Sequence, residues 1–220
     1  MHFRERTIDV EGRPSSYRLY VPPDLEPPLP LILFLHGRGE SGDDGLKPTT
    51  VGIGPAIERD PERFPALVVF PQASLTYGWR GWNLLAAVAA LDDVEQTFDV
   101  DLDRVYVTGL SMGGFGTWAI AALHSKRFAA VVPICGGFDG TATQMRRHEA
   151  AALLAGVPQW AFHGDADDVV TVEHSRKMVE ALRAAGSNIR YTEYEGVKHN
   201  SWDRAYAEPE LLPWTLAQRR

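Results

Sequence analysis

Strand-length apolar runs alternate with helical stretches along most of this chain, and this alternation constrains the fold more than any other feature. The runs LILFL, LVVF and VVPI are continuously apolar, which is typical of strands covered on both faces. Stretches with apolar residues at helical spacing lie between the later runs, for example at 84–98 and 172–186. Alternating strands and helices predict an α/β fold with a mostly parallel central sheet and helices on both faces.

Eight strands are expected in all. They are Thr7–Val10, Tyr17–Val21, Leu31–Leu35, Leu67–Phe70, Arg104–Thr108, Ala130–Ile134, Gln159–His163 and Ile189–Tyr194. The first two are joined by a short turn around Gly12 and Pro14, which predicts an antiparallel start to the sheet. The length of 220 residues suits one domain, so we expect a single α/β domain over residues 1–220.

Charge and composition narrow the classes of partner. The net charge is −7, from 22 basic and 29 acidic residues, and no basic run is available to neutralise the phosphates of a nucleic acid or an anionic membrane. The chain has one cysteine, Cys135, so no intrachain disulfide can form, and its N-terminus has no apolar stretch like that of a signal peptide. These features predict a cytoplasmic protein without nucleic-acid or membrane partners, and they leave the oligomeric state open.

One serine lies on a glycine-flanked hinge. The segment Gly109–Gly113 fits the pattern G-x-S-x-G with Ser111 at its centre, after a predicted strand and before a predicted helix. This context indicates a nucleophile elbow, in which the serine backbone is strained and glycine avoids collisions two positions away. The hydroxyl then emerges at a helix N-terminus, where free N–H groups favour an oxyanion.

Two other interpretations of the hinge are less favoured. A glycine-rich turn that only packs the helix against its strand would use the same glycines, but the strand–turn–helix context favours the elbow. A phosphate-binding loop is disfavoured because no G-K-[ST] follows. The segment Gly37–Gly42 fits the dinucleotide pattern G-x-G-x-x-G loosely, but no helical stretch opens directly after it.

A serine nucleophile needs a base, and in this fold an acid and then a histidine follow it along the chain. The candidate base is His199, in a loop after the last predicted strand. The candidate acids are Asp165, Asp167 and Asp168, in a loop after the strand before it. All of them lie at carboxyl ends of strands, on the side of the sheet where Ser111 emerges.

The other histidines and the metal interpretation carry less weight. His36 and His163 follow strands and precede glycine, so we expect them to be structural hydrogen-bonding residues at loop entries. A metal site is disfavoured, because no two histidines are spaced i, i+4 with a carboxylate and a lone cysteine offers no thiolate pair.

Four segments together resemble the α/β-hydrolase superfamily. They are FLHGRGESGDD, GLSMGGFGTWAIA, FHGDADDVVTVEHS and GVKHNSWDRAY. The chain is most similar to the small carboxylesterase and phospholipase-like branch labelled "predicted peptidase", which includes dienelactone-hydrolase-like and feruloyl-esterase-like proteins. The resemblance covers residues 31–214 and implies the α/β-hydrolase fold with no cofactor and no metal.

The resemblance also implies roles for individual residues. It makes Ser111 the nucleophile and His199 the general base. The family pattern H-G-x-x-D-x-x-V lies over His163–Val170, which selects Asp167 as the acid. Many relatives have proline where this chain has Asp168, so a second carboxylate adjoins the first.

The oxyanion hole of such proteins uses two backbone N–H groups, which here belong to Arg38 and Met112. The guanidinium of Arg38 is a candidate to meet an anionic part of a substrate. Dienelactone hydrolases proper use cysteine at the elbow, so the serine in this chain favours acyl transfer to water.

These observations predict a serine carboxylic-ester hydrolase that acts through an acyl-enzyme on small or short-chain esters. The alternatives are a serine peptidase, amidase or thioesterase of the same fold, or an inert hydrolase-like binding protein. Trp79 or Trp82, in a loop after the strand LVVF, is expected to line the acyl or alcohol pocket. The stretch 136–156 is the main room for a cap, which predicts no lid or a minimal one.

Overall fold

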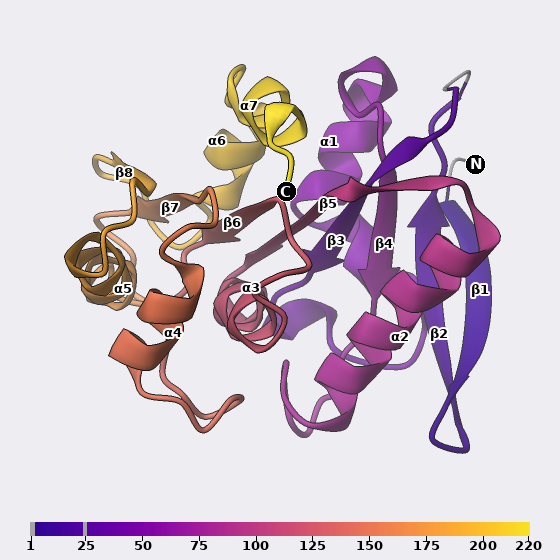
Figure 1. Ribbon diagram of the computed structural model, residues 1–220, viewed down its shortest axis with the longest axis horizontal. Coiled ribbons are helices and arrows are strands. Elements are labelled where there is room, and N and C mark those ends of the chain that lie inside the picture. The colour runs from indigo at the N-terminus through magenta and orange to yellow at the C-terminus, as the bar shows by residue number, and fades with distance from the viewer. Residues whose placement is uncertain (1–2, 24–25) are drawn as a thin grey trace.

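The computed structural model describes residues 3–23 and 26–220. Its strands form one eight-stranded sheet in the order β1-β2-β4-β3-β5-β6-β7-β8. The pairs β1–β2 and β2–β4 are antiparallel and the remaining pairs are parallel, so the predicted α/β fold with an antiparallel start is confirmed. Figure 1 shows the twisted sheet crossing the whole molecule from β8 to β1.

The strands are β1 Phe3–Val10, β2 Arg13–Tyr20, β3 Leu29–Leu35, β4 Leu67–Pro71, β5 Val100–Leu110, β6 Ala130–Ile134, β7 Trp160–Gly164 and β8 Arg190–Tyr194. The α-helices are α1 Ile53–Arg59, α2 Trp82–Thr97, α3 Met112–Leu123, α4 Arg147–Leu154, α5 Glu173–Ala184, α6 Trp202–Ala207 and α7 Leu211–Ala217. Three short 3-10 helices lie at Arg38–Glu40, Lys47–Thr50 and Pro61–Arg63. Within the described ranges, no helix is both long enough and apolar enough to cross a membrane.

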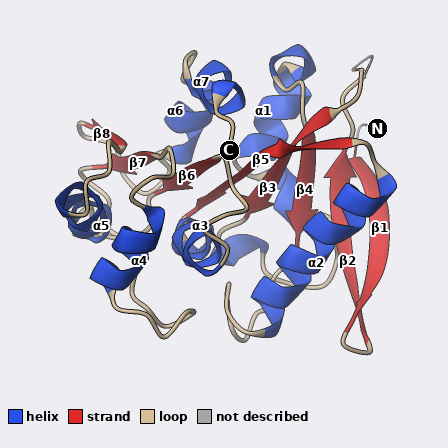
Figure 2. Cartoon of the chain, viewed as in Figure 1, coloured by secondary structure: helices blue, strands red, loops and turns tan. Residues whose placement is uncertain are grey.

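Helices cover both faces of the sheet. In Figures 1 and 2, α1, α6 and α7 lie on one side of the strands and α2, α3, α4 and α5 on the other. The side chains of β3 alternate between the two layers: Leu31 and Leu33 join the core under α2–α5, while Ile32 and Phe34 join the core under α1, α6 and α7. A central strand of a parallel sheet is therefore apolar at every position, as in the run LILFL.

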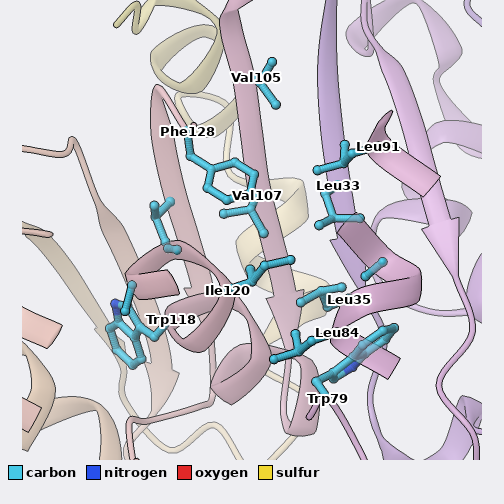
Figure 3. Close-up of a cluster of buried hydrophobic side chains, with 14 of the residues drawn as sticks. Leu33, Leu35, Trp79, Leu84, Leu91, Val105, Val107, Trp118, Ile120 and Phe128 are labelled. Carbon is cyan, nitrogen blue, oxygen red and sulfur yellow. The ribbon is translucent and has the colours of Figure 1, made fainter. Parts of the chain in front are cut away.

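The helix after the serine hinge is anchored by its apolar face. Trp118 and Ile120 of α3 belong to the same cluster of buried side chains as Val105 and Val107 of β5 (Figure 3). The indole N–H of Trp118 is satisfied within the core, since it donates to the side-chain oxygen of Gln159 at 3.0 Å. This packing holds the N-terminus of α3, and with it the hinge, in one place relative to the sheet.

Several strands extend beyond their predicted ends. The strand expected over Arg104–Thr108 begins at Val100 and runs to Leu110. Its first residues are half-buried or exposed and alternate between apolar and charged, so no continuous apolar run marks them, and pairing of Val100 with Leu29 extends the strand there. The β1–β2 hairpin is longer than predicted for the same reason, because its backbone pairing continues through residues with exposed side chains.

Candidate active site

The strand order places a crevice next to the serine hinge. In the sheet, β4 pairs with one edge of β3 and β5 pairs with the other edge, so the direction of winding reverses at β3. Ligands of open α/β sheets bind at such a switch point, outside the carboxyl ends of the strands. The loop after β3 carries Arg38 and the turn after β5 carries Ser111, so both predicted elements meet at this crevice.

Ser111 lies in a strained turn between β5 and α3. Its φ of 55° and ψ of −119° are uncommon for a residue other than glycine. The neighbouring glycines are required by close approach of the backbone. A Cβ at Gly113 would lie 1.8 Å from the carbonyl oxygen of Leu35, and one at Gly109 would lie 2.5 Å from the same oxygen. The turn therefore has the geometry that the glycine spacing predicts for a nucleophile elbow.

Three of the predicted site residues, Ser111, His199 and Asp167, are joined by consecutive hydrogen bonds. The Nε2 atom of His199 is 2.9 Å from Oγ of Ser111, and its Nδ1 atom is 2.7 Å from Oδ2 of Asp167. The side chain of Asp167 is fully buried, whereas that of His199 is about one-fifth exposed. The ring can therefore accept a proton from the serine through one nitrogen while the other nitrogen donates to a carboxylate.

The structure also separates the three neighbouring carboxylates. Oδ1 of Asp167 accepts the backbone N–H groups of Val169 and Val170, both at 2.9 Å. Asp168 points away to Lys198, and Asp165 accepts the N–H of Gly196. Only Asp167 of the three contacts the imidazole of His199.

The local hydrogen bonds of Asp167 also determine its charge. Burial by itself would raise the pKa of this carboxyl, but hydrogen bonds from His199 and from two backbone N–H groups outweigh it and lower the pKa below its usual value. Asp167 is therefore ionised at neutral pH and can stabilise positive charge on the ring.

The two residues predicted to form the oxyanion hole each begin a helix beside the serine. Met112 is the first residue of α3, and Arg38 is the first residue of the 3-10 helix after β3. The first N–H groups of a helix have no intrahelical acceptor, so both are available to an anion. Arg38 and Met112 line the same cleft as Ser111, as expected for an oxyanion hole.

The loop that carries Arg38 is supported by two buried rings. His36 accepts the N–H of Ala73 through Nε2 at 2.9 Å, so its Nδ1 carries the hydrogen and donates to the oxygen of Gly37 at 2.6 Å. Burial lowers the pKa of His36 to about 4, which keeps the ring neutral. The indole of Trp79 donates to the carbonyl of His36 at 2.9 Å. His36 is thus the structural hydrogen-bonding residue predicted from the sequence.

The cleft next to Ser111 has a volume of about 420 Å³. One wall is formed by the loop 75–80 and the other by the loop 138–143. Trp79 lines this cleft, as predicted, although most of its ring is buried beneath the surface. Trp82 is not among the residues that line the cleft: it begins α2, and its ring nitrogen Nε1 is 3.4 Å from the carbonyl oxygen of Val10 in the β1–β2 hairpin.

One residue near the site was not anticipated. Cys135 follows β6, the strand next to β5, and its sulfur is 3.3 Å from the backbone nitrogen of Ser111. The rule that carboxyl ends of parallel strands share one edge, applied to the run VVPICGG, would have placed it there. The φ of Cys135 is 40°, so two strained residues adjoin at this point.

Cys135, Asp167 and His199 have potential metal-binding atoms within 4.8 Å of one another. Their chemistry fits a hydrogen-bonded array better than a metal site. Burial raises the pKa of Cys135 to about 12, so it remains a thiol, whereas the thiolate is the form that binds metal ions. The facing atoms of Asp167 and His199 already hydrogen-bond to each other.

Comparison with known proteins agrees with this fold. Residues 80–208 match the model of the Dienelactone hydrolase family, which is more than half of the chain. This chain belongs to the dienelactone hydrolase family. The match spans the elbow, the loop with Asp167 and the loop with His199, but it begins after the loop that carries Arg38.

Three relatives illustrate what this family member is similar to. A thermostable esterase of known structure has a TM-score of 0.87 and 32% identity, covering 100% of this chain and 64% of that one. A bifunctional acetylxylan esterase/xylanase of Neocallimastix patriciarum is 26% identical over 79% of this chain and 24% of its own length. Acyl-protein thioesterase 1 of Candida albicans is 24% identical over 80% of this chain and 87% of its own.

The first curated relatives are longer than this chain. This family member spans only 24% to 48% of the length of the first curated relatives that it matches. The family match and the fold place this chain among proteins of the α/β-hydrolase type.

Proposed function

We propose that this chain is a serine carboxylic-ester hydrolase that acts through an acyl-enzyme on small or short-chain esters. The observation that carries the proposal is the continuous hydrogen-bonded array from Ser111 through His199 to Asp167 at the edge of a cleft. Serine is a weak nucleophile unless a base takes its proton, and this array supplies the base and the group that orients it.

In the proposed acylation step, Ser111 is the nucleophile and His199 is the general base. Oγ of Ser111 attacks the ester carbonyl carbon while Nε2 of His199 takes the hydroxyl proton. The carbonyl oxygen becomes an oxyanion, which the N–H groups of Arg38 and Met112 stabilise by about 3 kcal/mol each. Asp167 stabilises the imidazolium that forms. Collapse of the tetrahedral intermediate breaks the bond to the alcohol oxygen, and His199 returns the proton to that oxygen.

Deacylation reverses the roles. His199 takes a proton from water as the water oxygen attacks the acyl carbon bound to Ser111. The second tetrahedral intermediate uses the same two N–H groups, and its collapse releases the carboxylic acid while the proton returns to Ser111. Water and ester are the reactants, and alcohol and acid are the products, so no further co-reactant is needed.

The cleft supports a substrate of modest size. Its volume of about 420 Å³ is at the small end of ligand pockets, which run from about 300 to 1,000 Å³. Leu75, Tyr77 and Val169 line the cleft and remain mostly exposed. In the segment 136–156, where a cap was expected if anywhere, the structure has the single helix α4 after a loop that lines the cleft. An open cleft of this kind suits short acyl groups.

The experiment compares hydrolysis of p-nitrophenyl acetate, butyrate and octanoate by the unmodified protein and by Ser111→Ala. We expect Ser111→Ala to lose nearly all turnover while keeping its circular dichroism spectrum. The matched control is Ser125→Ala, a half-buried serine that lines a separate shallow pocket with Arg220. A fluorophosphonate probe should label the unmodified protein and Ser125→Ala but not Ser111→Ala.

Three outcomes would contradict the proposal. Full ester hydrolysis by folded Ser111→Ala would show that another group is the nucleophile. Turnover of a peptide anilide that exceeds turnover of every ester in the panel would make the chain a peptidase, and faster octanoate than acetate hydrolysis would overturn the short-chain preference.

A further inference from the structure

The carboxylate of Asp167 contacts a second histidine besides His199. The Nε2 atom of His163, in β7, is 3.2 Å from Oδ2 of Asp167, the same oxygen that lies 2.7 Å from Nδ1 of His199. The side chains of His163 and Asp167 are both fully buried. The hydrogen-bonded array that begins at Ser111 therefore does not end at Asp167.

The neighbours of His163 determine where its hydrogen lies. Its Nε2 atom faces two acceptors, the carboxylate of Asp167 and, at 2.8 Å, the carbonyl oxygen of Val170. A ring nitrogen that faces two acceptors has to carry the hydrogen, because its lone pair would otherwise be repelled by the lone pairs of both oxygens. His163 thus donates through Nε2. Burial lowers the pKa of His163, although Val170 and Asp167 oppose this, so the ring is neutral at neutral pH.

The far side of the ring has its own partner. Nδ1 of His163 is 2.7 Å from Oγ of Ser175, a buried hydroxyl on α5. The hydroxyl of Ser175 also donates to the carbonyl oxygen of Gly136 at 2.8 Å, so Ser175 is held from a second direction. The contact with Ser175 and the one to Val170 hold the plane of the ring, so the N–H group is directed at Asp167 by two elements outside its own strand.

We propose that His163 is a positioning residue that shares the charge of Asp167 with His199. This inference rests on the proposed function, because it assigns a role through the base of the same site. The N–H of His163 holds the carboxylate so that Oδ2 faces His199. It also withdraws negative charge from that oxygen, which limits how strongly Asp167 favours the protonated form of His199.

Other charged groups near His163 do not replace this effect. Glu193 on β8 adds a charge that acts on His163, but its carboxylate is paired with Arg176 at 2.6 Å. Asp167 and His199 in the adjoining loops, the paired Glu193 on β8 and the buried thiol of Cys135 after β6 are the titratable groups around this part of the site. Of these titratable groups, only Asp167 loses a direct hydrogen bond when the N–H of His163 is removed.

The test uses two variants of His163 and the pH dependence of p-nitrophenyl acetate hydrolysis. His163→Leu removes the donor, and His163→Gln keeps an N–H group near the position of Nε2. We expect His163→Leu to lower kcat about tenfold with KM within about twofold, since Asp167 then orients the base less well. The acidic limb of kcat/KM should move to higher pH by about half a unit, because a stronger acceptor on Asp167 favours protonation of the base.

The Gln variant is the control for packing. Because it retains the donor, its acidic limb should stay within about 0.2 pH units of the unmodified protein, and most of kcat should return. Circular dichroism and thermal unfolding establish that each variant is folded. A folded His163→Leu with an unmoved acidic limb, or with activity lost equally at every pH, would assign His163 to packing alone and overturn the inference.

A measurement on the unmodified protein covers the case in which His163→Leu does not fold. The ¹⁵N spectrum of histidine-labelled protein, with His163 assigned by comparison with the Gln variant or by sequential labelling, should show hydrogen on Nε2 at neutral pH. The opposite tautomer would overturn the inference. These outcomes differ from failure of the proposed function, which is signalled by turnover in Ser111→Ala whatever His163 does.

Discussion

The Nε2 atom of His199 lies 2.9 Å from Oγ of Ser111, although 88 residues separate them in the chain. The contact exists because β5 and β8 belong to the same parallel part of the sheet, whose carboxyl ends lie along one edge. A proton can therefore pass from the hydroxyl to the ring without movement of the backbone. Single substitutions at this edge of the sheet are expected to have the following effects.

Asp167→Asn should reduce kcat on p-nitrophenyl acetate by on the order of 10⁴-fold, because an amide can present its N–H groups to His199 and select the wrong tautomer. Asp168→Asn is the matched control: its carboxylate is exposed and pairs with Lys198 at 3.2 Å, so its kcat should change less than twofold. Equal losses in the two variants, measured at saturating ester, would contradict the assignment of the acid.

Arg38→Pro should lower kcat about a hundredfold or more, since proline has no backbone N–H to offer the oxyanion. The position accepts proline, because it is the first residue of a 3-10 helix and Gly37 before it is extended, with φ of −78° and ψ of −178°. Arg38→Ala keeps the N–H and should hydrolyse a neutral ester at nearly the normal kcat. If the alanine variant loses as much activity as the proline variant, the side chain is the active group.

His36 should make the folded protein less stable as the pH falls from about 6.5 to 4. The unfolded chain binds a proton at His36 below its ordinary pKa of 6.5, whereas burial lowers the pKa in the folded protein to about 4. Stability falls wherever the unfolded state binds more protons, and this difference corresponds to about 3 kcal/mol over the whole window.

Urea unfolding at pH 7 and pH 4.5 measures this dependence. His36→Gln loses hydrogen bonds to Ala73 and Gly37 and should be less stable at pH 7, but its unfolding free energy should fall less between the two pH values. An identical fall in both proteins would show that His36 is already protonated in the folded state or does not stay buried.

Gly113→Ala should destabilise the fold by about 3 kcal/mol or more, because its Cβ would lie 1.8 Å from the carbonyl oxygen of Leu35 and backbone atoms on both sides are held in place. Gly156→Ala is the comparison, since a Cβ there meets nothing within 4 Å, and its unfolding free energy should stay within about 0.5 kcal/mol. Urea unfolding midpoints of the two variants measure this difference in stability. Equal midpoints would show that the backbone around residue 113 shifts to accommodate the Cβ without loss of stability.

The parts of the fold that were predicted best are those with a continuous apolar pattern. The strand Ala130–Ile134 has the predicted ends, and the run LILFL lies within the buried strand β3. The start of β5 and the full length of β1 could not be predicted in this way, because charged or exposed side chains interrupt the apolar pattern and backbone pairing with neighbouring strands extends them.

The candidate site shows the same division. Ser111, His199 and the group of acids were found because each follows a strand, and the resemblance selected Asp167 among them. The pattern of aromatic residues after β4 did not distinguish Trp79 from Trp82, since a loop and a helix start with similar composition can face the cleft or the β1–β2 hairpin. Cys135 was missed because the sequence shows a lone cysteine without the strand order that brings it to Ser111.

The sequence by itself determined the elbow at Ser111, because glycines at short spacing between a strand and a helix act locally and need no distant partner. Only the tertiary structure decided which oxygen of which aspartate meets His199, and that the same oxygen also meets His163. Those contacts depend on how β7, β8 and their loops align across the sheet, and a shift of one residue would exchange Asp167 for a carboxylate that faces solvent.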